Sequence, residues 1–151
     1  MVDFIIQDGR PVILEMTPRP GGDSIPDLIK MATGADLIGI HLDVMSGNRG
    51  APRKMDMPPE SFASINFYTP REGIIKIIDP SRILDIPWVR GVVLKKNVGD
   101  TVSLPPHDYD NRLLGYCIVS VKEKWNLIAV SEYLQNLLRI SFTDPPTGND
   151  A

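Results

Sequence analysis

The chain opens with two short apolar runs that predict a β-hairpin. Residues 2–6, VDFII, and residues 12–15, VILE, are separated by QDGRP, and the Asp-Gly pair in this linker is a strong hairpin-turn signal. Asp3 and Glu15 interrupt the apolar runs. Because side chains alternate along a strand, a turn centred on Gly9 places residue 3 opposite residue 15. In that register the other face collects apolar residues: Phe4, Ile6, Val12 and Leu14.

Two helices are predicted after the hairpin. In residues 23–34 the apolar positions fall on one face, Ser24 with Asp27 resembles a capping box, and Gly34 is a suitable stop. A second helix is expected over residues 36–45. Its apolar residues lie on more than one side, so we expect it to be mostly buried.

The second half of the chain has the pattern of a strand-rich unit. Residues 73–79 are expected to follow residues 62–69 through a turn, and a second strand–turn–strand is expected around Gly99-Asp100. A longer strand over 112–124, a helix capped by Asn126 with Leu127 among its inward residues, and a last strand at 139–142 complete the pattern. The order of elements predicts an α+β fold with a mainly antiparallel sheet.

This order also predicts how the chain is divided. The expected parts are a hairpin-plus-two-helices subdomain (1–46), a Gly- and Pro-rich loop (47–60), a strand-rich subdomain (61–143) and a disordered tail (144–151).

Composition and charge limit the partners and the cellular location that we expect for this protein. The net charge of −3 with no basic block gives no reason to expect nucleic acid as a partner. No apolar run reaches the roughly 20 residues of a membrane span, and the first residues lack a signal peptide's positive region, so we expect a cytoplasmic protein without membrane contact. The single cysteine, Cys117, lies in an apolar strand and is expected to be an inert core thiol.

The paired carboxylates of the hairpin suggest a metal site. Like charges directly opposite each other on a sheet are destabilising, and a cation between Asp3 and Glu15 removes that repulsion. Hard oxygen ligands of this kind suit Mg²⁺. The alternative is that one or both carboxylates lie on a solvated face of the sheet.

The stretch LEMTPRPGG, residues 14–22, adds groups that suit an anion. The planar guanidinium of Arg19 matches phosphate or carboxylate, and Gly21 and Gly22 allow backbone amides to approach a ligand. The N-terminus of the next helix would favour the same charge. The alternative is a structural arginine paired with Asp23 or Asp27, with glycines that serve only the turn.

Residues 2–22, VDFIIQDGRPVILEMTPRPGG, resemble the end of the nucleotide-binding region of ATP-grasp enzymes. The pattern is an acid, a hairpin, then Glu-x-Asn-x-Arg followed by small residues. The carboxylate–amine ligase branch is the most similar, with L-amino-acid ligases and relatives of biotin carboxylase and carbamoyl-phosphate synthase. The resemblance extends over nearly the whole chain, as the C-terminal half of an ATP-grasp domain, but its specific motif is confined to this stretch.

The resemblance implies a set of roles. Asp3 and Glu15 would be ligands of Mg²⁺ (or Mn²⁺), with Glu15 bridging, and Arg19 would contact the transferred phosphate. Gly21 and Gly22 would lie against the ATP co-substrate, and small-molecule carboxylates and amines would be the substrates. Thr17 occupies the family's asparagine position. Its hydroxyl can ligate Mg²⁺ but has a shorter reach, which puts a second metal in doubt.

A further departure is that the family's ATP-clamping lysines and glycine-rich loop precede the acid that matches Asp3. We therefore expect this chain to be the C-terminal piece of a longer enzyme, inactive and weak in ATP binding by itself, with the missing N-terminal part as its partner. A non-catalytic ATP-grasp remnant with a binding or regulatory role is the alternative. Exposed sheet edges also allow a homodimer.

Overall fold

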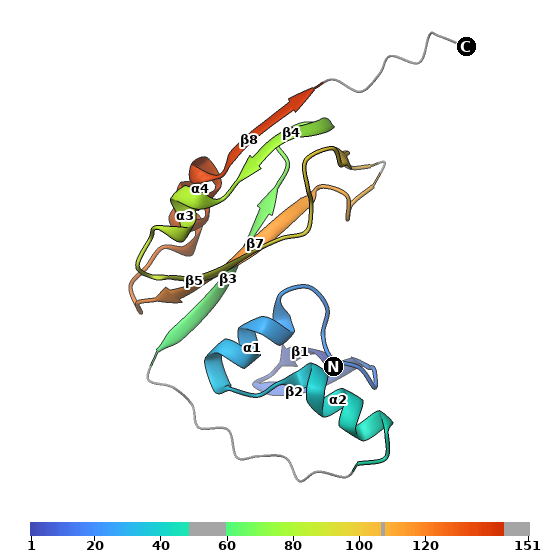
Figure 1. The fold of residues 1–151 in the computed structure, drawn as a ribbon. Helices are drawn as coiled ribbons and strands as arrows, with labels where there is room; N and C mark the ends of the chain where they lie inside the picture. The colour runs from blue at the N-terminus through green and yellow to red at the C-terminus, as the bar shows by residue number, and fades with distance from the viewer. Residues whose placement is uncertain (49–59, 107, 144–151) are drawn as a thin grey trace, which may run out of the picture. The chain divides into compact units, whose positions relative to one another are not determined.

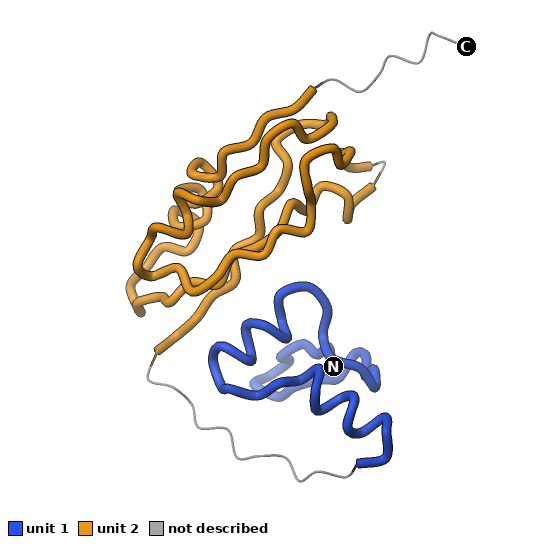
Figure 2. Tube along the Cα trace, in the orientation of Figure 1, with its two compact units in different colours: residues 1–59 blue, residues 60–151 orange. Residues whose placement is uncertain are grey.

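The computed structural model describes residues 1–48, 60–106 and 108–143. The chain divides into two compact units, residues Met1–Pro59 and Glu60–Ala151 (Figures 1 and 2). Helices and antiparallel strands occur together, which confirms the α+β prediction. The predicted tail (144–151) and most of the predicted loop (47–60) lie outside the described residues.

Unit 1 consists of the expected hairpin and two helices. Its elements are β1 (Val2–Gln7), β2 (Arg10–Met16), α1 (Ile25–Thr33) and α2 (Leu37–Met45). Asp8 and Gly9 both have positive φ, 52° and 73°, as a two-residue type I′ turn requires. The predicted Asp-Gly hairpin is thereby confirmed.

The register of the hairpin differs from the expected one over most of its length. Phe4 pairs with Ile13 and Ile6 with Pro11, because the turn has two central residues instead of being centred on Gly9. The predicted grouping of Phe4 and Ile6 with Val12 and Leu14 is therefore wrong. A β-bulge between Asp3 and Phe4 inserts Leu14 as an extra residue and restores the predicted partner of Asp3.

The ends of the two helices have local causes. Gly34 adopts a left-handed conformation with φ 75°, and its N–H donates to the Lys30 carbonyl, so α1 ends where the glycine predicted. The expected capping box does not form, because Ser24 at the N-cap makes no side-chain capping bond. At α2 the Asp36 carboxylate accepts from the Gly39 N–H at 3.0 Å, and this bond together with Lys30 lowers the pKa of Asp36.

The expectation that α2 is mostly buried is wrong. None of its residues is buried, and Leu42 and Met45 keep 62% and 72% of their surface exposed. Apolar residues lie on several sides of the helix, and unit 1 packs against only some of these sides. The exposed apolar residues therefore form a surface that the described residues of unit 1 leave uncovered.

Unit 2 contains two three-stranded antiparallel sheets, ordered β3-β7-β5 and β6-β4-β8. Its elements are β3 (Ser61–Tyr68), β4 (Gly73–Asp79), α3 (Ser81–Leu84), β5 (Val89–Leu94), β6 (Thr101–Val102), β7 (Leu113–Val121), α4 (Leu127–Leu137) and β8 (Arg139–Thr143). The buried core is shared by both sheets and the helices; its largest fully buried side chains are Phe67, Ile75, Ile83, Leu114 and Leu134.

Strand pairing in unit 2 is less local than expected. The strands follow one another in the expected order, but β3 does not pair with β4, nor β5 with β6. The reason is β7, in which residues 114–119 are all buried. A strand that is buried on both faces gains most when both edges are paired, and β7 pairs with β3 and β5.

Helix α4 is capped as predicted. The Asn126 carboxamide oxygen accepts from the N–H groups of Ile128 and Ala129 at 3.0 and 3.3 Å. Leu134 and Leu138 face the core, whereas Leu127 is 44% exposed, which corrects its expected inward position. Within the described ranges, none of the helices is long and apolar enough to cross a lipid bilayer.

Asn126→Ala is expected to lower the free energy of unfolding of unit 2 by about 1 kcal/mol, because two helix N–H groups lose their acceptor. Urea denaturation followed by circular dichroism measures this loss. Asn136→Ala at an exposed position in the last turn of the same helix is the control and should be neutral or slightly stabilising. Equal losses in both variants would show that the cap does not stabilise the helix.

Candidate functional site

The two carboxylates of the hairpin stand next to each other. Asp3 and Glu15 are direct partners in the β1–β2 ladder, as predicted, and directly paired residues project from the same face. Both are exposed, so a hydrated cation can reach them. Two adjacent carboxylates with water access match the donors by which proteins commonly hold Mg²⁺.

Thr17 continues the carboxylate face two residues beyond Glu15, but its hydroxyl is not accessible. Its backbone N–H donates to the Met1 carbonyl at 3.0 Å, which extends the ladder past β2. Its Oγ1 is buried and lacks a hydrogen-bond partner among the described residues. In this conformation the two carboxylates fit a metal, whereas the Thr17 hydroxyl does not.

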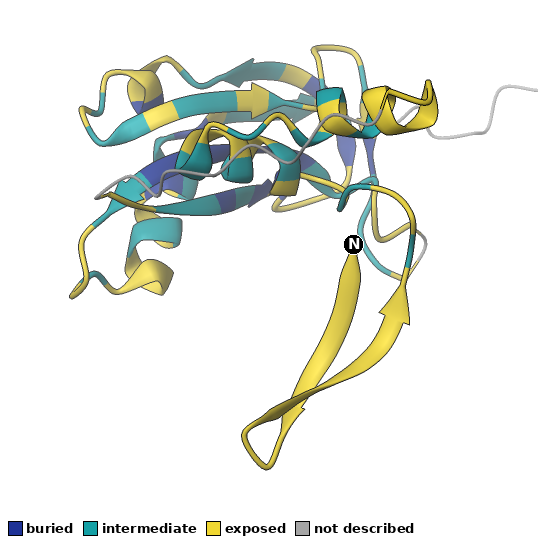
Figure 3. Ribbon diagram, turned by 90° about the horizontal axis from the view of Figure 1, so that it is seen from below, coloured by how far each residue is buried: buried dark blue, intermediate teal, exposed yellow. Residues whose placement is uncertain are grey.

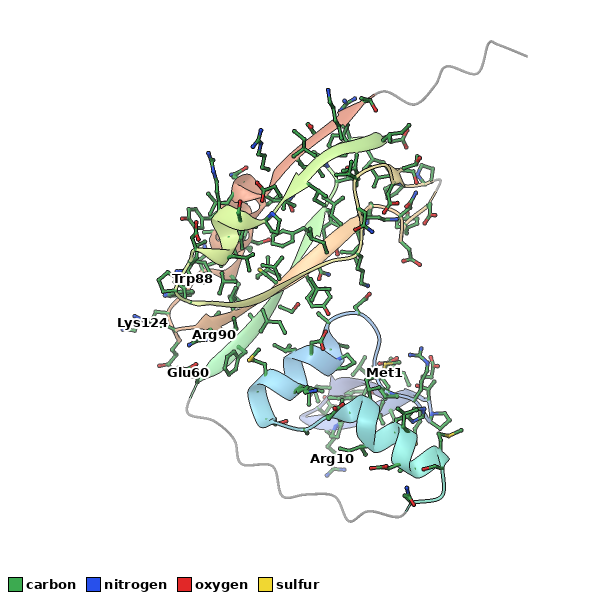
Figure 4. All side chains as sticks on the ribbon, in the orientation of Figure 1. Met1, Arg10, Glu60, Trp88, Arg90 and Lys124 are labelled. Carbon is green, nitrogen blue, oxygen red and sulfur yellow. The ribbon has the colours of Figure 1, made fainter. Side chains whose placement is uncertain are left out.

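Arg19 lies just past the hairpin with its guanidinium at the surface. Nη1 donates to the Pro20 carbonyl at 3.2 Å, and the side chain is exposed. The backbone nitrogen of Met1, labelled in Figure 4, lies 2.9 and 2.8 Å from the carbonyl oxygens of Thr17 and Arg19. These contacts place the start of β1 beside the backbone that carries Arg19, whose remaining guanidinium donors can meet an anion.

A cavity of about 650 Å³ joins several of the predicted residues. Asp3, Thr17 and Arg19 line it on the hairpin side, while Glu15 does not. The opposite wall is largely apolar and comes from α1 and α2: Ile25, Ile29, Leu37, Ile40 and Val44. The cavity therefore combines one carboxylate and one guanidinium with an apolar wall.

The glycine pair has different environments at its two positions. A Cβ at Gly21 would lie 3.1 and 3.2 Å from the Ile25 side chain, a tight contact that Ile25 would have to relieve by a small shift. A Cβ at Gly22 would meet nothing within 4 Å. The packing at Gly21 supports a role in the turn, and the open space at Gly22 leaves room for a ligand beside the backbone.

His41 is the cavity residue that the sequence reasoning missed. The apolar pattern of residues 36–45 favours a core histidine over a ligand at this position, but His41 is half-buried and lines the cavity. The signal was available in the helical spacing, because Leu37 precedes His41 by four residues and both line the same wall.

The described residues of unit 2 offer few side chains that are arranged to bind a metal. His107 lies outside the described residues, and the neighbouring Asp108 carboxylate accepts from the N–H groups of Asp110 and Asn111, as in an ordinary polar turn. Over residues 1–48, 60–106 and 108–143, no group of three or more His, Cys, Asp or Glu side chains is placed to hold a metal. The paired carboxylates of the hairpin remain the best candidate.

Cys117 is buried, as predicted, and burial raises the pKa of its thiol to about 12. We expect a thiol reagent at pH 8 to react at least about 100-fold more slowly with the folded chain than with the chain in urea. Since the unfolded thiol ionises first, the free energy of unfolding should fall as pH rises from about 9 toward 12. Cys117→Ala should lose this part of the pH dependence. Fast labelling of the native chain would contradict the burial of the thiol.

No family model matches the chain. An uncharacterised protein of Sinorhizobium fredii, y4rH, is 29% identical over 118 residues, which are 78% of this chain and 24% of that protein.

Two solved structures share the fold. Phosphoribosylglycinamide synthetase from Anaerococcus prevotii has a TM-score of 0.67 at 18% identity and is matched over 94% of this chain and 36% of its own. L-amino acid ligase from Bacillus licheniformis has a TM-score of 0.68 at 18% identity over 91% of this chain and 34% of its own. Both share an ATP-grasp fold.

The fold of this chain is therefore an ATP-grasp fold, which confirms the fold predicted from the hairpin motif. The chain spans about a quarter of the curated relative and about a third of each of the two structures.

Proposed function

We propose that this chain contributes the metal- and phosphate-binding wall of an ATP-dependent carboxylate–amine ligase. The observation that carries the proposal is the direct pairing of Asp3 with Glu15 on an exposed hairpin. The shared fold with two ligases supports it, because the reaction class of those proteins needs a site for a metal–phosphate complex.

In this proposal Asp3 and Glu15 hold Mg²⁺ or Mn²⁺ between their carboxylates. The metal would supply charge neutralisation at the phosphates of ATP during transfer to a substrate carboxylate. Arg19 presents its guanidinium to the phosphate or to the acyl phosphate, and the open backbone at Gly22 lies beside the ligand. Gly21 allows the loop to lie close to α1, and this packing positions Arg19 and Gly22.

The remaining parts of the site are proposed to come from a longer polypeptide. The chain spans only 34–36% of the two ligases, and neither a P-loop nor a G-x-G-x-x-G motif occurs in its sequence. We propose that the missing N-terminal part supplies the groups that clamp ATP, that substrates are a small carboxylate and an amine, and that the chain alone is inactive.

One observation favours a second candidate function. The buried, unpartnered Oγ1 of Thr17 stands where a metal ligand would be expected from the resemblance. A hydroxyl that cannot reach the ion leaves two carboxylates as the only protein ligands on this face. This arrangement would also suit a non-catalytic ATP-grasp remnant that binds a partner or has a regulatory role.

The experiment that separates the two functions is amine-dependent ADP release by the longer polypeptide with Mg²⁺, ATP and a panel of amino acids. The ligase proposal expects ADP release that requires both a carboxylate and an amine. If the polypeptide binds ATP and Mg²⁺ but releases no ADP with any pair, the non-catalytic function is favoured. ADP release by the 151-residue chain alone would contradict the proposal that the site is shared.

A further inference from the structure

The outer edge of β1 carries free backbone groups at two apolar positions. The type I′ turn bonds Gln7 to Arg10, so the next pair, Ile6 with Pro11, is a non-hydrogen-bonded pair of the ladder. By the same alternation Phe4 with Ile13 is also a non-hydrogen-bonded pair. The N–H and C=O groups of Ile6 and Phe4 therefore point away from β2, toward the outer edge of β1.

The outer edge of β2 is less suited than that of β1 to pairing with a further strand. Its first outward position is Pro11, which has no N–H to donate. The bulge at Leu14 then bends the strand, and charged residues stand at both ends of β2. Proline, bulges and charges are the features that protect natural edge strands from pairing. The run Phe4-Ile5-Ile6 in β1 has none of them.

The described residues of unit 1 also leave both faces of the hairpin exposed. Every residue of β1 and β2 is exposed, as Figure 3 shows, and Phe4 and Ile6 retain 55% and 64% of their surface. Ile5 and Val12 on the opposite face are exposed as well. Because an isolated two-stranded hairpin is at best marginally stable in water, this apolar pair of strands needs a third strand and covering layers.

We propose that a strand from outside these 151 residues, in the same longer polypeptide, pairs with the outer edge of β1. Within the described residues β1 has β2 as its only sheet neighbour. About three quarters of the curated relative and two thirds of each ligase lie beyond the matched region, which is ample chain for such a strand. The inference rests on the longer polypeptide of the proposed function but does not depend on metal binding or catalysis.

Amide hydrogen exchange tests this pairing without any ligand. In the longer polypeptide the amides of Phe4 and Ile6 should exchange at least about 100-fold more slowly than in the 151-residue chain, while the amide of Ile13 on the β2 edge should not change. Unslowed exchange at Phe4 and Ile6, or slowing at Ile13 instead, would overturn the proposal. Protection in the 151-residue chain that rises with its concentration would assign the edge to a second copy and overturn it equally. A gene that encodes only these 151 residues would do so as well.

Two matched variants keep the test open if exchange is hard to resolve. Ile6→Pro and Ile13→Pro remove the same side chain and one outward N–H each, from opposite edges of one hairpin. In the longer polypeptide Ile6→Pro should lower Tm by roughly 5–10 °C more than Ile13→Pro. Equal shifts would mean that the β1 edge is unpaired. Because thermal unfolding without Mg²⁺ or ATP is the readout, loss of catalysis leaves this result unaffected.

Discussion

Glu15→Gln is expected to lower amine-dependent ADP release by the longer polypeptide about 1000-fold while leaving its fold intact. The substitution keeps the size of the side chain but removes one of the two adjacent charges that would hold the metal. Losing several kcal/mol of charge stabilisation at the phosphates corresponds to a rate loss of this order. Initial rates of ADP release over a range of Mg²⁺ concentrations measure the effect.

Asp8→Asn provides the matched control for this variant. It makes the same change of charge in the same hairpin, at a turn position with φ 52° that asparagine tolerates well. Its rate should remain within about twofold of the unmodified polypeptide. If Glu15→Gln keeps more than a tenth of the rate with unchanged Mg²⁺ dependence, Glu15 does not have the role proposed here.

Gly115→Ala is expected to be the most damaging single substitution for unit 2. A Cβ at this buried position of β7 would overlap the Val93 carbonyl oxygen and lie 2.9 Å from the Leu94 Cα. The neighbouring atoms are backbone atoms of β5, so relief requires the two strands to separate. We expect the free energy of unfolding to fall by more than about 3 kcal/mol, measured by urea denaturation.

Gly91→Ala is the control, because Gly91 lies in β5 of the same sheet and an added Cβ would meet nothing within 4 Å. That variant should lose less than about 1 kcal/mol. Similar losses at both positions would mean that general strand propensity, and not contact between β5 and β7, determines the effect.

In the hairpin, the local sequence predicted the turn but not the bulge. Asp8-Gly9 predicted the turn correctly, because only a few residues accept positive φ at both central positions. The partner of Asp3 was also correct, but for a reason the sequence did not reveal. The turn sets one register and the bulge at Leu14 then shifts it by one residue. A bulge depends on packing around the whole strand, and a local pattern carries little information about it.

Long-range pairing was the part of the fold that local signals could not predict. Turn residues around Gly99 correctly predicted a strand, a turn and a strand, but they did not indicate that β5 pairs with β7, more than 20 residues away. The buried run of β7 competes for neighbours on both edges, and this competition outweighs a favourable turn. The prediction that α2 is mostly buried was wrong for a similar reason. An apolar helix predicts burial, but not whether the covering residues belong to the same chain segment.

The candidate site was predicted best where it follows from strand geometry. Asp3 with Glu15 required only the ladder, whereas the burial of the Thr17 hydroxyl depends on packing around it. His41 enters the cavity through the placement of α2 within unit 1, which no motif specifies. The fold of nearly the whole chain was predicted only through the family resemblance of residues 2–22, and not from the strand geometry of the hairpin.

A Mn²⁺ titration of the isotope-labelled 151-residue chain tests most directly whether Asp3 and Glu15 together hold a divalent cation. Because paramagnetic broadening detects even weak binding, substoichiometric Mn²⁺ should first broaden the amide signals of Asp3 and Glu15. Glu15→Gln should abolish this selectivity and Asp8→Asn should preserve it. Broadening that is centred on other acidic residues such as Asp108 and Asp110, or that is unchanged in Glu15→Gln, would contradict the claim.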